Sequence, residues 1–144
     1  MATAGNFFTK DEQKLLVAAI AAAELKTSGE IRLHIQNFCF GSEIKSAEKV
    51  FVKLKMHQTK QRNGVLIYIA ALSKKIAVVG DEGIHQKLGD PFWQNVVDKL
   101  IKQFKADKKA RALADCILEC GQQLGNYFPR STNDSNELSN AISF

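Results

Sequence analysis

The feature that most constrains the fold is an apolar run of seven residues, Val65–Ala71. A short run this rich in β-branched residues is typical of a central strand that is covered on both faces. A polar tip at Ser73–Lys75 separates it from a second apolar run, Ile76–Val79, which ends at Gly80. We therefore expect a hairpin of two antiparallel strands, the first of them in the middle of a sheet.

An earlier segment alternates between apolar and polar residues. Ile31, Leu33 and Ile35 are each followed by a polar residue, which predicts a strand with one apolar face. Helical spacing then returns before the central strand, at Ala47, Val50, Phe51 and Leu54. A strand, a crossover helix and a second strand make a βαβ unit, so we expect these two strands to be parallel.

Helical periodicity covers most of the remaining chain. Thr9 and Glu12 form a capping-box pattern ahead of the first helix. A further helix is predicted to begin after Asp90, with Pro91 in its first turn, and the last helix closes near Phe128. The predicted fold class is thus α/β, with helices on both faces of a small mixed sheet.

The chain has the length of one ordinary domain, at 144 residues. We expect a single α/β domain over residues 1–130 and a tail rich in Asn and Ser over residues 131–144. The tail is predicted to be mobile unless Leu138, Ile142 and Phe144 dock onto the domain.

Charge and cysteine content exclude several classes of protein. The net charge is +5, but basic residues alternate with acidic ones, so we expect no nucleic-acid binding. No apolar stretch approaches the roughly 20 residues of a membrane span, and acids near Thr9 favour a mature helix over a signal peptide. Three cysteines without metal-type spacing suit a reducing compartment, which makes the cytoplasm the expected location.

Two acids between glycines are the most suggestive local feature. Asp81 and Glu82 lie between Gly80 and Gly83 at the end of a predicted strand, and Asp90 precedes a predicted helix. Clustered carboxylates with permissive turns suit calcium or magnesium. The residues alone leave a structural alternative open, in which Asp81 and Glu82 are exposed turn residues and Asp90 only caps its helix.

Five further polar residues bear on the position of a site. Glu30 opens the first strand, and Arg62 precedes the central strand, where it could pair with a carboxylate or a phosphate. Asp134 and Glu137 resemble half a calcium loop, although the EF-hand glycine is missing. His34, on the polar face of its strand, is expected at the surface rather than as a ligand.

Common catalytic templates are absent from the sequence. It contains neither a G-x-S-x-G elbow nor a phosphate-binding P-loop. In open α/β sheets ligands collect at the carboxyl ends of parallel strands, which directs attention to the loops after Gln36 and Ala71.

Several motifs, in this order, resemble the TPM domain family over about residues 7–128. They are Thr27–Ile31 (TSGEI), Arg62–Ile67 (RNGVLI) and Gly80–Ile84 (GDEGI) with Gly89–Asp90. The family includes a thylakoid acid phosphatase and many bacterial proteins of unknown role, and this chain is similar to a soluble bacterial member. The resemblance implies a three-layer α/β/α sandwich with a mixed central sheet.

The resemblance also implies a metal site, most often for calcium, near the strand ends. Glu30 and Asp90 match the acids of the general motif. Where many members have an aromatic residue between the two glycines, this chain has Asp81 and Glu82, which adds negative charge. That departure favours metal binding and weakens any transfer of substrate preference.

Two functions follow, and the sequence leaves open whether the chain is an enzyme. The first is a calcium-type binding domain, with magnesium as the second ion, that serves a protein partner in an interaction or stress- and repair-related role. The second is a metal-dependent acid phosphatase, in which Arg62 holds phosphoryl oxygens and Asp81 or Asp90 acts as acid or base. The lack of a covalent nucleophile favours binding over catalysis.

Overall fold

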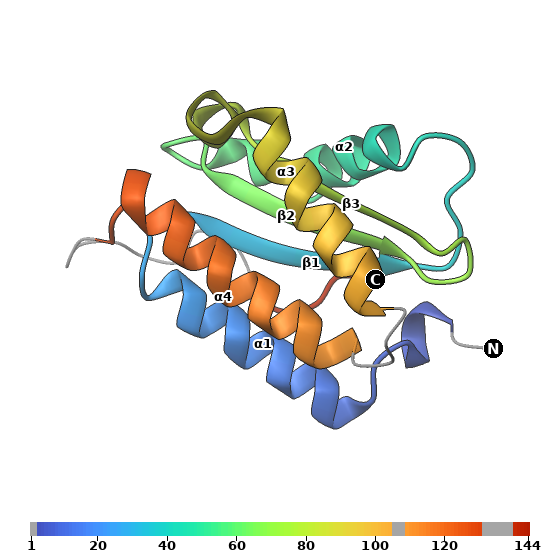
Figure 1. Ribbon diagram of the computed structural model, residues 1–144. Coiled ribbons are helices and arrows are strands. Elements are labelled where there is room, and N and C mark those ends of the chain that lie inside the picture. The colour runs from blue at the N-terminus through green and yellow to red at the C-terminus, as the bar shows by residue number, and fades with distance from the viewer. Residues whose placement is uncertain (1–2, 105–108, 131–139) are drawn as a thin grey trace.

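A three-stranded mixed sheet forms the middle layer of a three-layer α/β/α sandwich (Figure 1). The structure, a computed structural model, describes residues 3–104, 109–130 and 140–144, without the side chain of Asp90. Strand β1 (Glu30–Gln36) runs parallel to β2 (Gly64–Ala70), which pairs antiparallel with β3 (Lys75–Gly80). The predicted βαβ unit with an added hairpin strand is confirmed.

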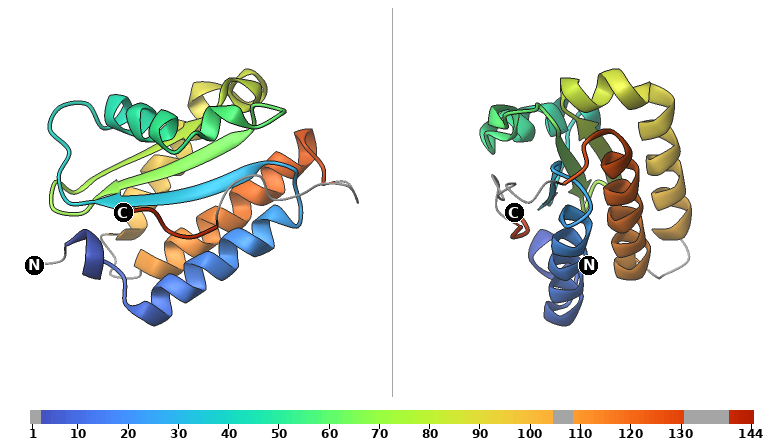
Figure 2. Two further views of the ribbon diagram at one scale, coloured as in Figure 1. Left: turned by 180° about the vertical axis from the view of Figure 1, so that it is seen from behind. Right: turned by 90° about the vertical axis from the view of Figure 1, so that its left-hand side faces the viewer.

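Helices cover both faces of this sheet, as expected (Figure 2). Three long helices share one hydrophobic core with the sheet, and on the opposite face α2 packs together with Met56 of η2 and Cys39. The helices are α1 (Lys10–Glu24), α2 (Glu43–Lys53), α3 (Glu82–Phe104), α4 (Lys109–Tyr127) and two short 3₁₀ helices, η1 (Ala4–Asn6) and η2 (Met56–Gln58).

Strand β2 is buried along its whole length. Its alternate side chains enter two separate cores, Val65 and Ile67 toward α1, α3 and α4, and Leu66 and Tyr68 toward α2. This agrees with the prediction of a central strand that is covered on both faces.

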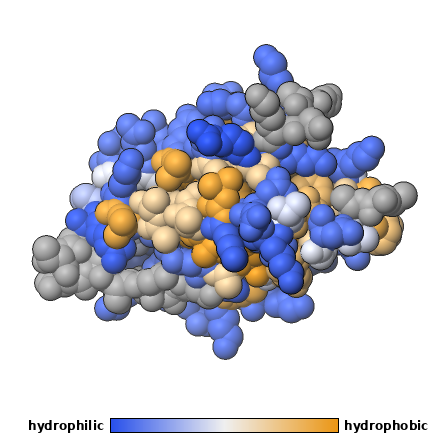
Figure 3. All heavy atoms as spheres, turned by 90° about the horizontal axis from the view of Figure 1, so that it is seen from below, coloured by the Kyte–Doolittle hydropathy of each residue, from blue (hydrophilic) through white to orange (hydrophobic). Residues whose placement is uncertain are grey.

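Helices α1 and α4 pack closely because small residues meet where they touch. A Cβ added at Gly121 would lie 2.6 Å from the Cβ of Ala23, and one at Gly125 would lie 2.6 Å from the carbonyl oxygen of Lys26. The face that these helices form shows an apolar band between polar margins (Figure 3), and Leu15 of α1 is exposed.

Helix α3 begins earlier than the sequence predicts. Its first residue is Glu82 rather than Pro91, and the helical geometry is interrupted at Gly89, with φ 74° and ψ 172°. The predicted helix start thus corresponds to a kink, and the segment expected to be a turn forms the first part of the helix. That part has few apolar residues, so it carries little helical periodicity.

The outer edge of β1 is covered by the end of the described chain. The N–H of Ile35 donates to the carbonyl of Ser143 at 2.8 Å, and the N–H of Ser143 donates to the carbonyl of Leu33 at 2.9 Å. Ile142 packs against the core and Phe144 is exposed, while Leu138 lies outside the described residues. No described helix is long and apolar enough to cross a membrane.

His34 is buried, which corrects the expectation that it lies at the surface. Its Nδ1 is 2.9 Å from the Oγ of Ser143, its Nε2 is 2.9 Å from the Oε1 of Gln36, and its ring stacks on Tyr68. Burial lowers the pKa of His34. Strand alternation could not predict this burial, because the covering residue is Ser143, 109 positions away in the sequence.

Replacing Gly121 with alanine is expected to destabilise the domain by about 1–2 kcal/mol, because the new methyl group must push α1 away from α4. Urea unfolding would measure the loss. Gln122→Ala, at an exposed position of the same helix, is the control and should have little effect. A Gly121→Ala variant more stable than the parent would show that the clash does not set the helix separation.

Candidate functional site

The predicted site residues gather at one end of the sheet. Glu30 is paired with Gly64 in β2, and the N–H of Asp81 donates to the carbonyl of Gly64 at 2.9 Å. The acids therefore flank the same β2 residue, at the amino end of the parallel strands. This end lies opposite the loops after Gln36 and Ala71. The expectation that ligands collect at the carboxyl ends of the parallel strands therefore does not locate these acids.

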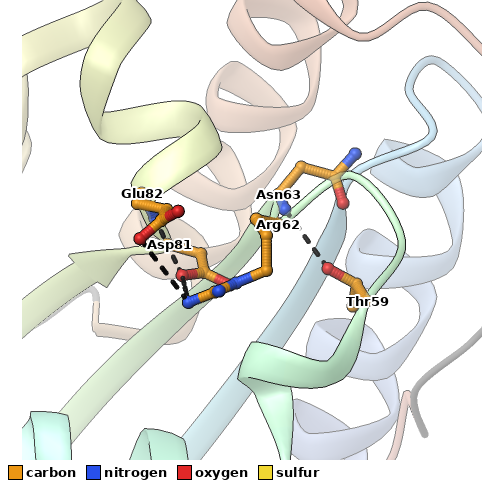
Figure 4. A network of polar contacts seen from close by, with 5 residues as sticks. All are labelled: Thr59, Arg62, Asn63, Asp81 and Glu82. Carbon is orange, nitrogen blue, oxygen red and sulfur yellow. Dashed lines mark hydrogen bonds and ion pairs between the residues drawn. The ribbon is translucent and has the colours of Figure 1, made fainter.

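Arg62 and Asp81 form a bidentate ion pair (Figure 4). The guanidinium donates from Nε to Oδ2 at 2.8 Å and from Nη2 to Oδ1 at 2.9 Å. The Asp81 side chain is 5% exposed and that of Arg62 is 42% exposed, so the pair lies at the boundary of the core. The hydrogen bond with Asp81 raises the pKa of Arg62. Of the two pairings that the sequence left open for Arg62, with a carboxylate or with a phosphate, the structure contains the one with a carboxylate.

Asp81 also begins α3. Its Oδ1 accepts the N–H of Glu82 at 2.8 Å, and its carbonyl accepts the N–H groups of Ile84 and His85. Glu82 itself is exposed, with a carboxylate oxygen 3.9 Å from the Nη2 of Arg62. The Asp81 carboxylate therefore accepts three hydrogen bonds, which suits a helix cap held by an arginine.

A close backbone approach places Arg62 on the first turn of α3. The N–H of Gly83 donates to the carbonyl of Arg62 at 3.0 Å. A Cβ at Gly83 would lie 2.4 Å from the carbonyl oxygen of Gln61, so only glycine fits this contact. Arg62 has φ 51°, and the next N–H, of Asn63, donates to the Oγ1 of Thr59 at 3.2 Å (Figure 4).

A second pair of acids, Glu24 and Glu30, lies at the start of β1. Both are buried, at 5% and 2% exposure. The pKa of Glu24 is raised to about 8, chiefly by burial and further by the charge of Glu30 and a hydrogen bond between the two side chains, while the N–H of Ile31 and the charge of Arg130 act to lower it. The N–H of Ile31 donates to Glu24 Oε2 at 2.9 Å, and Arg130 donates to the Glu24 carbonyl at 2.7 Å.

Glu24 was not among the residues predicted from the sequence. One signal could have found it, because Glu24 continues the spacing of Leu16 and Ile20 at four-residue intervals. Both of those residues are fully buried, so an acid at the next position lies on the buried stripe of α1.

The other predicted ligands are not brought together. Asp90 has no described side chain, and Asp134 and Glu137 lie outside the described residues. In the part of the chain that the structure describes, no three or more His, Cys, Asp or Glu side chains form a group that could hold a metal. The Oδ1 of Asn63 is buried and has no hydrogen-bond partner there.

The family model of the TPM domain matches residues 2–123. The chain belongs to the TPM domain family. A similar solved structure is the NMR structure of the BA42 protein from the psychrophilic bacterium Bizionia argentinensis, with a TM-score of 0.87 and 41% identity. That match covers 95% of this chain and 94% of BA42.

No curated protein sequence matched the chain. The family model identifies this chain as a TPM domain. BA42 shares its fold over nearly the whole length of both chains.

Removing the Asp81 carboxylate is expected to destabilise this TPM domain. Asp81→Ala deletes the acceptor of the Glu82 N–H and leaves Arg62 without its partner, for a loss of about 1–3 kcal/mol in the free energy of unfolding. Asp81→Asn keeps one acceptor and should lose less. Asp115→Ala removes an exposed ion pair with Arg111 and should change stability by less than about 0.5 kcal/mol.

The Glu24 carboxyl should make stability depend on pH. Its pKa is raised from 4.5 to about 8, so its contribution is complete below pH 4.5 and disappears as the pH rises toward 8. Glu24→Gln imitates the protonated form. From pH 5 to 8.5 the variant should therefore gain stability relative to the parent, by on the order of 3 kcal/mol.

Urea unfolding across this pH range would measure the gain, with Glu119→Gln as a control because Glu119 is exposed and paired with Lys99. Parallel pH profiles for the parent and Glu24→Gln would show that Glu24 is ionised in the folded protein at neutral pH.

Proposed function

We propose that this TPM domain binds a divalent cation, calcium first and magnesium second, at the Glu24 and Glu30 pair. The observation that carries the proposal is the burial of two carboxyl groups in contact, from α1 and β1. Two buried carboxylates in contact repel each other, and either a shared proton or a bound cation between them removes that repulsion.

The donor atoms near this pair suit a hard cation. The N–H of Glu30 donates to the carbonyl of Asn63 at 3.3 Å, so Asn63 lies beside Glu30, directly before β2. Its Oδ1 is a buried acceptor without a partner among the described residues. Carboxylate and amide oxygens are ligands that calcium and magnesium accept. A bound ion would cross-link α1 and β1 and stabilise the folded state by mass action.

Other predicted ligands have less support. Asp81 could bind a cation only after releasing Arg62, since the guanidinium occupies both of its carboxylate oxygens. Glu82 is exposed beside the same arginine. Asp90, Asp134 and Glu137 stay predictions, and the proposal does not depend on them.

The acid phosphatase remains the alternative function. Arg62 is partly exposed and could hold phosphoryl oxygens, but Asp81, the expected acid or base, is already bound to Arg62 and to the N–H of Glu82. The geometry therefore supports binding over catalysis. We propose a non-catalytic cytoplasmic module that serves a protein partner, and its three free cysteines agree with a reducing compartment.

Thermal unfolding in chelator, calcium and magnesium would test cation binding. A cation at ten times its Kd should raise the melting temperature by roughly 3–5 °C. Glu30→Gln and Glu24→Gln should each lose the shift, whereas Glu119→Gln should keep it. Since the cation must displace a proton, affinity should rise by about tenfold per pH unit below the pKa of Glu24.

The outcomes separate the candidates. The absence of a shift with any divalent cation would refute cation binding. If Asp81→Asn abolishes the rise in melting temperature and Glu30→Gln does not, the cation binds beside Arg62 and Asp81 rather than at Glu24 and Glu30. Metal-dependent hydrolysis of p-nitrophenyl phosphate that Arg62→Ala removes would favour the phosphatase.

A further inference from the structure

The two outer edges of the sheet differ. The edge of β1 forms hydrogen bonds with Ser143, while β3 has β2 on one side and no described strand on the other. An open edge strand offers a row of backbone donors and acceptors to any extended chain that reaches it. The edge of β3 is thus a place where another segment can add to the sheet.

The hydrogen-bond register identifies the outward backbone groups. Asp81 and Gly64 form a hydrogen-bonded pair, which fixes the alternation along the hairpin. Lys75, Ala77 and Val79 therefore bond to β2. Ile76, Val78 and Gly80 direct their N–H and C=O groups outward, and no hydrogen bond joins these groups to any described residue. These three alternate residues can accept a short strand.

A groove of ≈ 1000 Å³ runs along this edge, between α2 and α3, and β3 forms its floor. Both helices contact β3, one from each face of the sheet (Figure 1). The α2 wall carries two acids and an exposed apolar residue, and the α3 wall is apolar at its centre. The wall residues are Glu43, Ile44 and Glu48 from α2, and Trp93, Val97 and Ile101 from α3.

We propose that this groove binds an extended segment of a partner protein, in which apolar residues alternate with lysine or arginine, as an antiparallel strand on β3. A peptide residue directly opposite Ile76 or Val78 has its side chain on the same face as they do. Those side chains belong to the core beneath α3, so the apolar peptide residues meet the α3 wall. The alternate residues face Glu43 and Glu48.

Charges at the two ends of the edge favour the antiparallel direction. Lys74 is exposed ahead of β3 and Glu82 is exposed after it, and both line the groove. A short antiparallel peptide with free termini would place its carboxylate beside Lys74 and its ammonium group beside Glu82. A parallel peptide would place like charges together at both ends.

The test uses the whole chain and an octapeptide of four Lys-Val repeats with free termini. Trp93, the only tryptophan, lines the groove, so its fluorescence can report binding. The net charge of +5 should repel this peptide and attract one of Glu-Val repeats. If the groove is the binding site, the Lys-Val peptide should bind, and the Glu-Val peptide should bind at least about tenfold more weakly.

Backbone methylation of the peptide tests strand addition directly. The valine N–H groups should face β3, so N-methylation at the valines should weaken binding by about tenfold or more. N-methylation at the lysines, whose N–H groups face away, should change the affinity by less than about threefold. Equal losses from the two methylation patterns would overturn the proposal.

Charge reversal on the protein supplies the matched control. The double variant Glu43→Lys/Glu48→Lys should reverse the preference, so that the acidic peptide binds better. Asp115→Lys/Glu119→Lys changes the net charge equally on α4 and should preserve the parent's preference. If neither peptide binds, the proposal is refuted. It is also refuted if analytical ultracentrifugation shows a concentration-dependent dimer that Ile44→Asp abolishes, because a second copy of the chain would then occupy the edge of β3.

Discussion

The complete burial of β2 is the constraint on which the rest of the domain depends. A strand that is covered on both faces needs one layer of helices above it and another below, and its side chains enter two cores that do not mix. One layer is large and holds α1, α3 and α4, while the other consists of α2 and the short η2. Among the described residues one strand lies on each side of β2, so both neighbours are edge strands, and only the edge of β1 forms hydrogen bonds with a further segment, at Ser143.

Local patterns predict most of this architecture. The apolar run at β2, the alternation along β1 and the capping box at Thr9 each encode their element within a few residues, and all are confirmed. Two features depend on distant residues and could not be predicted. The burial of His34 requires Ser143, and the early start of α3 requires the contact between Gly83 and the backbone before Asn63.

The sequence predicts only part of the candidate site, again because some of its contacts depend on distant residues. The motifs place Glu30, Arg62 and Asp81 at one end of the sheet, and the sequence allowed Arg62 to pair with a carboxylate. It did not show that this pairing would occupy both oxygens of Asp81. Nor did it identify Glu24 as the neighbour of Glu30, because that contact arises only when α1 packs under β1. Carboxylate count is visible in a sequence, whereas the partner of each carboxylate is a tertiary property.

The two ends of the described chain have a consequence for how the domain can be joined to other proteins. The N–H of Ala4 donates to the Asn37 side chain at 2.7 Å, and Ser143 bridges to His34, so both ends lie near the carboxyl end of β1 (Figure 2). Glu30 and the neighbouring Glu24 lie at the other end of β1, about 20 Å away. A fusion partner or surface anchor attached at either end would therefore leave that acidic end free, and a short linker joining the ends would permit a circular permutant.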